Sequence, residues 1–350
     1  MAAKPSVVEI EGKHLSLTNL DKVLYPATGF TKGQVINYYA RIAPVLLPHL
    51  KDHPLTLKRY PGGVNEEFFF EKNATKHRPD WVKTVPIWSE GNQRNVNYIL
   101  ANDLPTLVWI ANLAGIELHP SLSLAKDITS PRSMVFDLDP GAPANIVQCC
   151  QVAMRLRAIF DHFGLQSFPK TSGSKGLQIY VPINSPTSYD VTKPFAHALA
   201  RLLEDEHRDL VVSDMKKQLR VGKIFVDWSQ NDEHKTTISV YSLRAREHPT
   251  VSTPVTWDEV AQALSKKDAN LLVFEANQVL ERVQQMGDLF EPVHSLKQKL
   301  PKLSGIAEIS VAEKGLDIAA QAEDRDIKKT AKKAKAPVRR AASKKKSRKV

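Results

Sequence analysis

The stretch Met134–Pro140 constrains the fold most, because it must form a strand that carries two acids on one face. It reads M-V-F-D-L-D-P, with a proline at its end. Side chains alternate between the two faces of a strand, so Asp137 and Asp139 point the same way, with Cα atoms about 7 Å apart. Leu138 then faces a core. The two carboxylates repel each other unless a cation lies between them, and oxygen ligands suit Mg²⁺ or Mn²⁺. The alternative interpretation is an exposed D-x-D at a strand-to-turn junction.

A second apolar strand also ends in an acid. Ile224–Val226 is followed by Asp227, and Arg220 and Lys223 precede it closely. If this strand lies beside the first one, three carboxylates come together. Such a group can hold two divalent ions about 4 Å apart, which clamp an in-line phosphoryl transfer. The same acids in a two-metal phosphodiesterase or nuclease would activate water, and this alternative stays open.

A loop of small residues lies between these two strands in the sequence. Ser172–Gly176 reads S-G-S-K-G and leads into another strand. Glycines let backbone N–H groups approach an anion, while serine hydroxyls and Lys175 add donors and positive charge. The spacing is not that of a Walker A loop, and a strand rather than a helix follows. An ordinary hairpin turn with one exposed lysine is the alternative interpretation.

Hydrophobic periodicity predicts helices and short strands in a mixed order. We expect helices over Lys32–Leu47, Asp103–Ala114, Asn145–Phe163, Val191–Glu206, Trp257–Ser265 and 276–286, and further strands over 55–60, 81–90, 94–100, Ile116–His119 and Thr236–Tyr241. Several strands follow one another without a helix between them. This order favours an α+β fold over a regular βαβ array.

Phe68, Phe69 and Phe70 are adjacent in a predicted strand. They cannot all face one core, so at least one is exposed or covers a ligand, unless both faces of the sheet are buried. A nucleic acid base could stack on an exposed ring, which is worth about 1–3 kcal/mol.

The positive charge is concentrated at the C-terminus. The net charge is +11, and residues 328–350 contain twelve Lys and Arg but no Asp or Glu, so the rest of the chain is nearly neutral. A segment of this composition is expected to be disordered and to bind a polyanion such as nucleic acid, although a solubility tail is the alternative. The predicted organisation is a domain over 1–295, a weakly structured linker over 296–327 and the basic tail over 328–350.

The composition is typical of a cytoplasmic protein. No apolar run approaches the roughly 20 residues that span a bilayer, and the first residues lack a secretory signal, so no membrane is expected as a partner. Cys149 and Cys150 are adjacent, without metal-site spacing, and are predicted to be buried thiols.

Several stretches, taken together and in order, resemble one known family. They are L-T-N-L-D-K-V-L-Y-P-A-T-G, K-R-Y-P-G-G-V, F-F-F-E-K, F-D-L-D-P-G, T-S-G-S-K-G-L, I-F-V-D-W-S-Q-N and Y-S-L-R-A-R. The combination, which covers about residues 14–290, resembles the polymerase domain of bacterial ligase D, a member of the archaeo-eukaryotic primase superfamily that works in non-homologous end joining. No ligase adenylation or phosphoesterase motif is present, so a stand-alone paralogue is expected.

The resemblance implies an α+β primase-like catalytic core with central β-sheets flanked by helices. It implies a template-dependent DNA/RNA polymerase that fills short gaps and extends DNA ends, using rNTPs or dNTPs with two Mn²⁺ or Mg²⁺ ions. The implied partners are gapped or broken DNA with a downstream 5′-phosphate and, in addition, Ku and a DNA ligase, which would place the protein at the nucleoid.

The resemblance also assigns roles to individual residues. The catalytic and metal-binding acids are Asp137, Asp139 and Asp227; the nucleotide-binding residues are Lys58, His119 (towards the ribose), Ser172, Lys175, Arg220, Lys223 and Arg244; the DNA-binding residues are Asn19, Lys22 and Lys32 at the 5′-phosphate and Phe69 and Phe70 against the template. One position departs from the family: Gln178 stands where the family has histidine. A non-catalytic DNA-end-binding protein, with Gln178 as a sign of lost activity, is therefore a further alternative.

Overall fold

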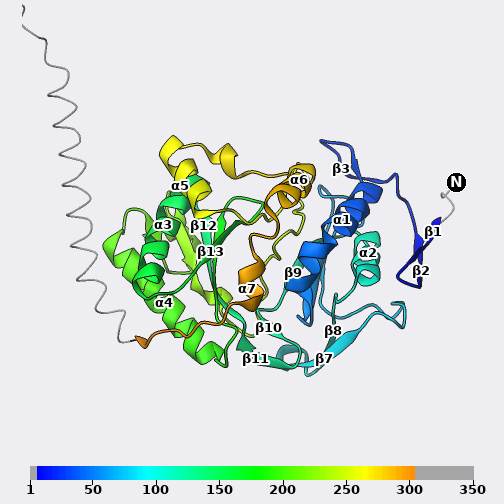
Figure 1. The fold of residues 1–350 in the computed structure, drawn as a ribbon, viewed down its shortest axis with the longest axis horizontal. Helices are drawn as coiled ribbons and strands as arrows, with labels where there is room; N and C mark the ends of the chain where they lie inside the picture. Colours follow the sequence, from blue (N-terminus) through cyan, green and yellow to red (C-terminus); the bar gives the residue numbers. More distant parts are fainter. Residues whose placement is uncertain (1–5, 304–350) are drawn as a thin grey trace, which may run out of the picture. The chain divides into compact units, whose positions relative to one another are not determined.

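The structure is a computed structural model that describes residues 6–303. Two five-stranded sheets form its framework (Figure 1). The N-terminal sheet has the order β6 (Phe69–Glu71), β5 (Leu55–Arg59), β8 (Arg94–Ile99) and β7 (Thr84–Ser89), with β9 (Gly115–Pro120) also paired to β5. The central sheet has the order β13 (Phe168–Thr171), β14 (Leu177–Pro182), β12 (Ser133–Pro140), β16 (Ile224–Asp227) and β15 (Val211–Val212).

The strand pairing establishes the α+β class that the sequence predicts. Every strand pair between these elements is antiparallel except β15 with β16. Three two-stranded pairs complete the strands: β1 (Ser6–Ile10) with β2 (Lys13–Leu17), β3 (Val23–Tyr25) with β4 (Phe30–Thr31), and β10 (Ser123–Leu124) with β11 (Asp127–Pro131).

Six of the seven α-helices in residues 6–303 lie close to their predicted positions, and the short last one, near residue 291, was not predicted. They are α1 (Lys32–Leu50), α2 (Leu104–Asn112), α3 (Ile146–His162), α4 (Tyr189–Glu206), α5 (Trp257–Lys266), α6 (Ala276–Met286) and α7 (Glu291–Ser295). Thr31 caps α1 in a capping box with Gln34, as its position predicts. Helices α3 and α4 both contact β12 of the central sheet, whereas α1 and α2 pack on each other beside the N-terminal sheet (Figure 1).

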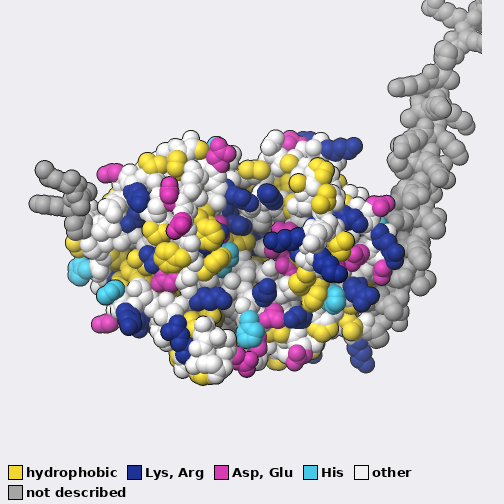
Figure 2. All heavy atoms as spheres, turned by 180° about the vertical axis from the view of Figure 1, so that it is seen from behind, with side chains coloured by type: hydrophobic (Ala, Val, Ile, Leu, Met, Phe, Trp, Pro, Cys, Tyr) yellow, Lys and Arg dark blue, Asp and Glu magenta, His cyan; other side chains and the backbone are white. Residues whose placement is uncertain are grey.

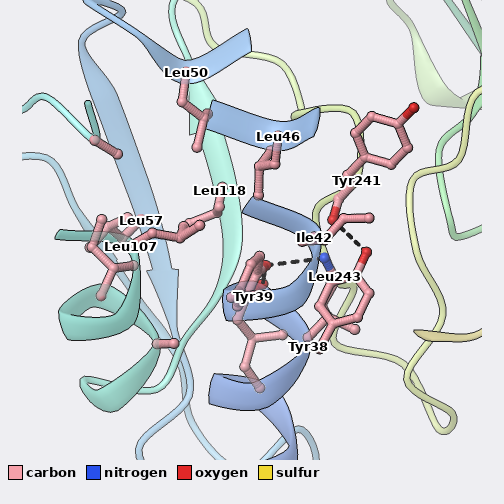
Figure 3. Packing of buried hydrophobic residues seen from close by; sticks show 14 of the residues in the cluster. Tyr38, Tyr39, Ile42, Leu46, Leu50, Leu57, Leu107, Leu118, Tyr241 and Leu243 are labelled. Carbon is pink, nitrogen blue, oxygen red and sulfur yellow. Dashed lines mark hydrogen bonds between the residues drawn. The ribbon is translucent and has the colours of Figure 1, made fainter. Parts of the chain in front are cut away.

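Helix α1 joins the N-terminal sheet to a distant part of the chain. Its residues Tyr38 and Tyr39 are fully buried (Figure 3). The Tyr38 hydroxyl donates to the carbonyl of Tyr241 at 2.8 Å, and the Tyr39 hydroxyl donates to the carbonyl of Ile116 at 2.6 Å. Tyr39 also accepts from the backbone N–H of Leu243 at 3.1 Å. A buried hydroxyl costs free energy unless it is hydrogen-bonded, so these bonds fix residues 241–243 against β9.

The predicted strand over Thr236–Tyr241 is wrong. The backbone N–H groups of Thr237 and Ser239 do bond to carbonyls at the end of β9. The residues form one isolated bridge, from Thr236 to Ser121, and Tyr241 then turns the backbone with a φ of +62°. An alternating apolar pattern thus reflects a segment that lies along a sheet without completing a ladder.

The described fold continues to the end of the predicted domain. Of the described residues, 6–301 belong to one compact unit. The Gln298 side chain donates to the carbonyls of Gln166 and Pro182, so ordered contacts extend a few residues past the predicted boundary at 295. Most of the predicted linker and the whole basic tail lie outside the described residues. Cys149 and Cys150 are buried free thiols, as predicted. Within residues 6–303, no helix has the length and apolar character that crossing a bilayer requires.

Candidate active site

Three acids lie together at one end of the central sheet. Asp137 of β12 is directly opposite Asp227 of β16 in the antiparallel register, and Asp139 follows two residues along β12. Leu138, between the two acids of β12, is fully buried. Residues two apart on one strand share a face, and directly opposite residues share it as well. The sequence prediction that these strands are neighbours is therefore confirmed.

The surroundings of Asp137 and Asp139 disfavour the negative charge of these two carboxylates. Burial, with the neighbouring charge of Asp139, raises the pKa of Asp137 to about 8. Burial and the charge of Asp227 likewise raise the pKa of Asp139, whose side chain remains open to solvent on one side. A divalent cation would offset this repulsion, and carboxylate oxygens are ligands that Mg²⁺ and Mn²⁺ prefer. The donor set therefore fits such an ion.

The Asp227 carboxylate is held by the turn that follows it. One oxygen accepts from the backbone N–H and the hydroxyl of Ser229 at 3.0 and 2.6 Å, and the other accepts from Gln230 Nε2 at 3.0 Å. Within residues 6–303, no three His, Cys, Asp or Glu side chains stand as a ready metal-binding group. Asp227 Oδ2 accepts only the bond from Gln230, so it keeps a lone pair with which an ion could bind.

Gln178 connects Asp137 to a buried lysine. It is paired with Asp137 across β12 and β14 and hydrogen-bonds to its carboxylate. The Gln178 side-chain oxygen accepts from Lys170 Nζ at 2.6 Å, and Lys170 also donates to Ser252 Oγ at 2.7 Å. Lys170 is completely buried, and this burial holds its pKa well below the usual range. An amide can donate and accept at once, so Gln178 satisfies both neighbours.

The loop Ser172–Gly176 connects β13 to β14 beside the acids. The Ser172 hydroxyl oxygen accepts from the backbone N–H groups of Ser174 and Gly176 at 3.2 and 3.1 Å, which leaves its proton available to donate. A Cβ atom on Gly176 would lie 2.2 Å from the carbonyl oxygen of Leu138, so only glycine fits there. Lys175 is exposed, and its charge stabilises the ionised form of Asp139.

Two arginines approach the acids from other segments. Arg244 donates from Nη1 to the Ser172 carbonyl at 2.5 Å, and the charges of Arg220 and Arg244 both stabilise ionised Asp139. Arg220 lies over the ring of Phe225 and donates to the carbonyl of Met215 at 2.8 Å. The predicted nucleotide ligand Lys223 is engaged elsewhere, because its ammonium donates to the Arg208 carbonyl.

The N-terminal sheet contributes a second group of side chains. Lys58 on β5 is paired with Glu117 on β9 and with Phe70 on β6, so the three side chains form a row across one face. His119, two residues after Glu117, lies on the same face and donates or accepts through Nε2 to Glu117 at 3.0 Å. Arg244 Nε lies 3.2 Å from Glu117, so it joins this row to the loop of the central sheet.

All three phenylalanines of the aromatic stretch are exposed. Phe68, Phe69 and Phe70 keep 49%, 45% and 57% of their surface, so the interpretation that they are buried on both faces of a sheet is wrong. Lys58 Nζ lies 3.9 Å from the ring centre of Phe68, and the Arg59 guanidinium lies 5.0 Å from that of Phe69. Exposed rings beside cations are suited to bases on a charged backbone.

Asn19, Lys22 and Lys32 come together near the start of α1. Lys22 accepts at its carbonyl from the Lys32 backbone N–H at 2.8 Å and donates to the Asn19 carbonyl from its own N–H at 3.1 Å. Lys32 is buried, and its ammonium donates to the carbonyl of Thr18 at 2.6 Å. Within residues 6–303, neither Lys22 nor Lys32 forms an ion pair with a carboxylate. Two close cations without a counterion favour an anion-binding site. Figure 2 shows further Lys and Arg side chains around a hollow in the middle of one face.

Comparisons with known proteins decide the family. The LigD primase-polymerase domain family matches residues 31–290. The chain is 42% identical over 283 residues to the multifunctional non-homologous end joining protein LigD of Mycolicibacterium smegmatis, and 31% identical over 300 residues to the bifunctional LigD of Bacillus subtilis. The chain belongs to the LigD primase-polymerase domain family. The predicted resemblance is thereby confirmed.

A solved LigD structure supports the same fold. The polymerase domain of Mycobacterium tuberculosis ligase D in complex with DNA superposes with a TM-score of 0.74 at 38% identity, covering 81% of this chain and 99% of that domain. The match to the M. smegmatis protein covers 80% of this chain but only 36% of that protein. The match to the B. subtilis protein covers 83% of this chain and 47% of that protein. The chain thus spans less than half the length of each of these curated relatives.

Sequence reasoning missed two buried residues of this LigD-type site. Glu117 and Lys170 lie in apolar strands, where a single charged residue gave no signal on its own. The signal was available in the pairing of strands: Glu117 shares a face with His119 and lies opposite Lys58, and Lys170 lies opposite Gln178. A charged residue inside a buried strand needs a partner, so each should have been placed beside another site residue.

Proposed function

We propose that this chain is a metal-dependent, template-directed nucleotidyltransferase that fills short gaps and extends ends of broken DNA with rNTPs or dNTPs. The observation that carries the proposal is the convergence of three strand-end acids with the Ser172–Gly176 loop and Arg244. A two-metal nuclease needs the acids but has no use for this group of triphosphate-sized donors and charges.

In this proposal, each residue of the site has a separate role in nucleotide addition. Divalent ions held by Asp137, Asp139 and Asp227, with Mn²⁺ favoured, would supply the charge that activates the primer hydroxyl and stabilises the leaving pyrophosphate. The triphosphate is bound by the Ser172 hydroxyl and by the cations Lys58, Lys175, Arg220 and Arg244, while His119 lies towards the ribose. Lys223 could join only after releasing the Arg208 carbonyl.

Two groups of residues outside the nucleotide site would contact the DNA. The exposed rings of Phe69 and Phe70 stack on the template, and Asn19, Lys22 and Lys32 bind the 5′-phosphate of the downstream strand. We further propose a place at the nucleoid, with Ku and a DNA ligase as partners of the same repair process.

Primer extension on a gapped duplex with a 5′-phosphate and Mn²⁺ tests the proposal. The wild type is compared with Asp137→Ala/Asp139→Ala and with the control Asp161→Asn/Asp205→Asn, whose acids are exposed on α3 and α4. Templated addition by the wild type and the control, lost in the first variant, supports a polymerase. Degradation of the primer instead would indicate a nuclease. Equal DNA binding by all three proteins without any addition would indicate a DNA-end-binding protein.

A further inference from the structure

Glu117 lies at the centre of the cationic side chains of the proposed nucleotide pocket, and it has no role in the function argued above. It is a carboxylate on β9 with only 3% of its surface exposed. Its two oxygens face different donors. Oε1 accepts from the Ala245 backbone N–H at 3.1 Å and lies 3.2 Å from Arg244 Nε, whereas Oε2 lies 3.0 Å from His119 Nε2.

The charge state of this carboxylate follows from its neighbours. Burial opposes ionisation of Glu117, but the hydrogen bond from His119 and the charge of Arg244 outweigh it and bring the pKa to about 2. Burial also lowers the pKa of His119 below its ordinary value. Near neutral pH the pair is therefore a carboxylate beside an uncharged imidazole.

This pair allows only one tautomer of His119. An ionised carboxylate can only accept hydrogen bonds, so His119 Nε2 must carry the proton that it donates to Oε2. An uncharged imidazole has a single N–H, so Nδ1 keeps its lone pair and is an acceptor. Within residues 6–303, no hydrogen bond to Nδ1 is formed.

An acceptor close to the cations Lys58 and Arg244 would select a particular part of the nucleotide. An ionised triphosphate offers acceptors, which the cations Lys58 and Arg244 match and Nδ1 does not. The donors of a nucleoside triphosphate are the N–H groups of the base and the hydroxyls of the sugar. The base N–H groups differ between bases, and a templated enzyme must accept every base, so a sugar hydroxyl is the shared donor, in line with the position towards the ribose that the family resemblance implies for His119.

We propose that Glu117 is a positioning residue that fixes His119 with Nδ1 as the acceptor for a sugar hydroxyl of the incoming nucleotide, and that it thereby sets the sugar preference. The proposal rests on the proposed polymerase function. A site built to bond a hydroxyl discriminates against the analogue that lacks it, because the buried partner is then left unpaired.

Glu117→Gln reverses the arrangement with almost no change in shape. The amide oxygen keeps the place of Oε1, where the Ala245 N–H donates to it and the Arg244 guanidinium lies 3.2 Å away, so the amide NH₂ takes the place of Oε2. That NH₂ needs an acceptor at His119 Nε2, so the imidazole proton moves to Nδ1, which becomes a donor. An isosteric amide beside a histidine is known to impose the wrong tautomer in this way.

The experiment measures kcat/KM for single-nucleotide addition with an NTP, its 2′-deoxy and its 3′-deoxy analogue. The control is Glu71→Gln, which alters a buried carboxylate that pairs with Arg59 and does not touch His119. We expect Glu117→Gln to reduce discrimination against one deoxy analogue by about 3- to 10-fold, mainly through KM, because the sugar hydroxyl must turn from donating to Nδ1 to accepting from it. The control should leave both ratios unchanged.

The nitrogen NMR spectrum of His119 gives a second measurement that does not depend on turnover. The proton should be on Nε2 in the wild type and on Nδ1 in Glu117→Gln. Unchanged ratios for both analogues in an active variant, or a wild-type His119 with its proton on Nδ1, would overturn the inference. A wild type that adds no nucleotide at all would instead remove the proposed function, and the spectrum would still decide the tautomer.

Discussion

Raising the pH from about 7 to about 9 should weaken binding of 5′-phosphorylated DNA roughly ninefold, because Lys32 loses its charge in this interval. Burial, with the charges of Lys22 and Arg59, lowers the pKa of Lys32 to about 8. A lysine with a lowered pKa is charged below that value and neutral above it. A phosphate binds the charged form, so the free protein must carry the proton to bind.

The magnitude follows from the fraction of charged Lys32 in the free protein. With a pKa of about 8, about 90% is charged near pH 7 and about 10% near pH 9, which corresponds to about 1.3 kcal/mol of binding free energy. A terminal phosphate has its second pKa near 6, so it remains a dianion over the whole interval. The DNA therefore contributes no titration of its own.

The assay is fluorescence anisotropy of gapped DNA with and without the 5′-phosphate, at several pH values and constant ionic strength. The ratio of the two dissociation constants isolates the phosphate from the rest of the DNA. Lys32→Arg is the matched control, because arginine stays charged throughout. We take the dissociation constant without the 5′-phosphate divided by that with it, and expect this ratio to fall as the pH rises. A wild-type ratio that does not change with pH, or a Lys32→Arg ratio that falls as much as that of the wild type, would refute the reasoning.

Two further predictions concern the loop and the tail. Gly176→Ala should lower the thermal unfolding temperature and raise the nucleotide KM, because its Cβ would lie 2.2 Å from the Leu138 carbonyl oxygen. Overpacking of this kind costs about 1–3 kcal/mol. The control is Gly91→Ala, at a position with open space, and equal effects of the two substitutions would contradict the argument. Deletion of residues 328–350 should reduce the salt dependence of DNA binding, because twelve Lys and Arg are removed, while single-nucleotide addition is retained. An unchanged salt slope would show that the tail does not contact DNA.

The end of the central sheet that carries the three acids could be predicted because its pattern depends on a few consecutive residues. The alternation in Met134–Pro140 places two acids on one face, and the similar pattern before Asp227 suggests a neighbouring strand. Period-two alternation and a proline at the strand end are properties of a few consecutive residues. The antiparallel register that puts Asp227 opposite Asp137 then needs only that the two strands are adjacent.

The rest of the site depends on contacts that no single stretch contains. Glu117 becomes informative only when β9 is paired with β5, and Lys170 only when β13 is paired with β14. The Thr236–Tyr241 segment has the alternation of a strand but forms one isolated bridge, at Thr236, and turns at Tyr241, where φ is +62°. Its alternation arises from packing beside β9, which a pattern read along one segment cannot separate from true pairing.

Arg244 connects the two sheets at the candidate site. One guanidinium pairs with Glu117 of the N-terminal sheet, donates to the Ser172 carbonyl of the central-sheet loop and stabilises ionised Asp139. The segment that carries Arg244 has no regular secondary structure and is fixed instead through Tyr38 and Tyr39 of α1, which bond residues 241–243. A shift of α1 would therefore move Arg244 relative to the acids, and the same contacts that build the core set the spacing between the sugar-facing and phosphate-facing halves of the proposed pocket.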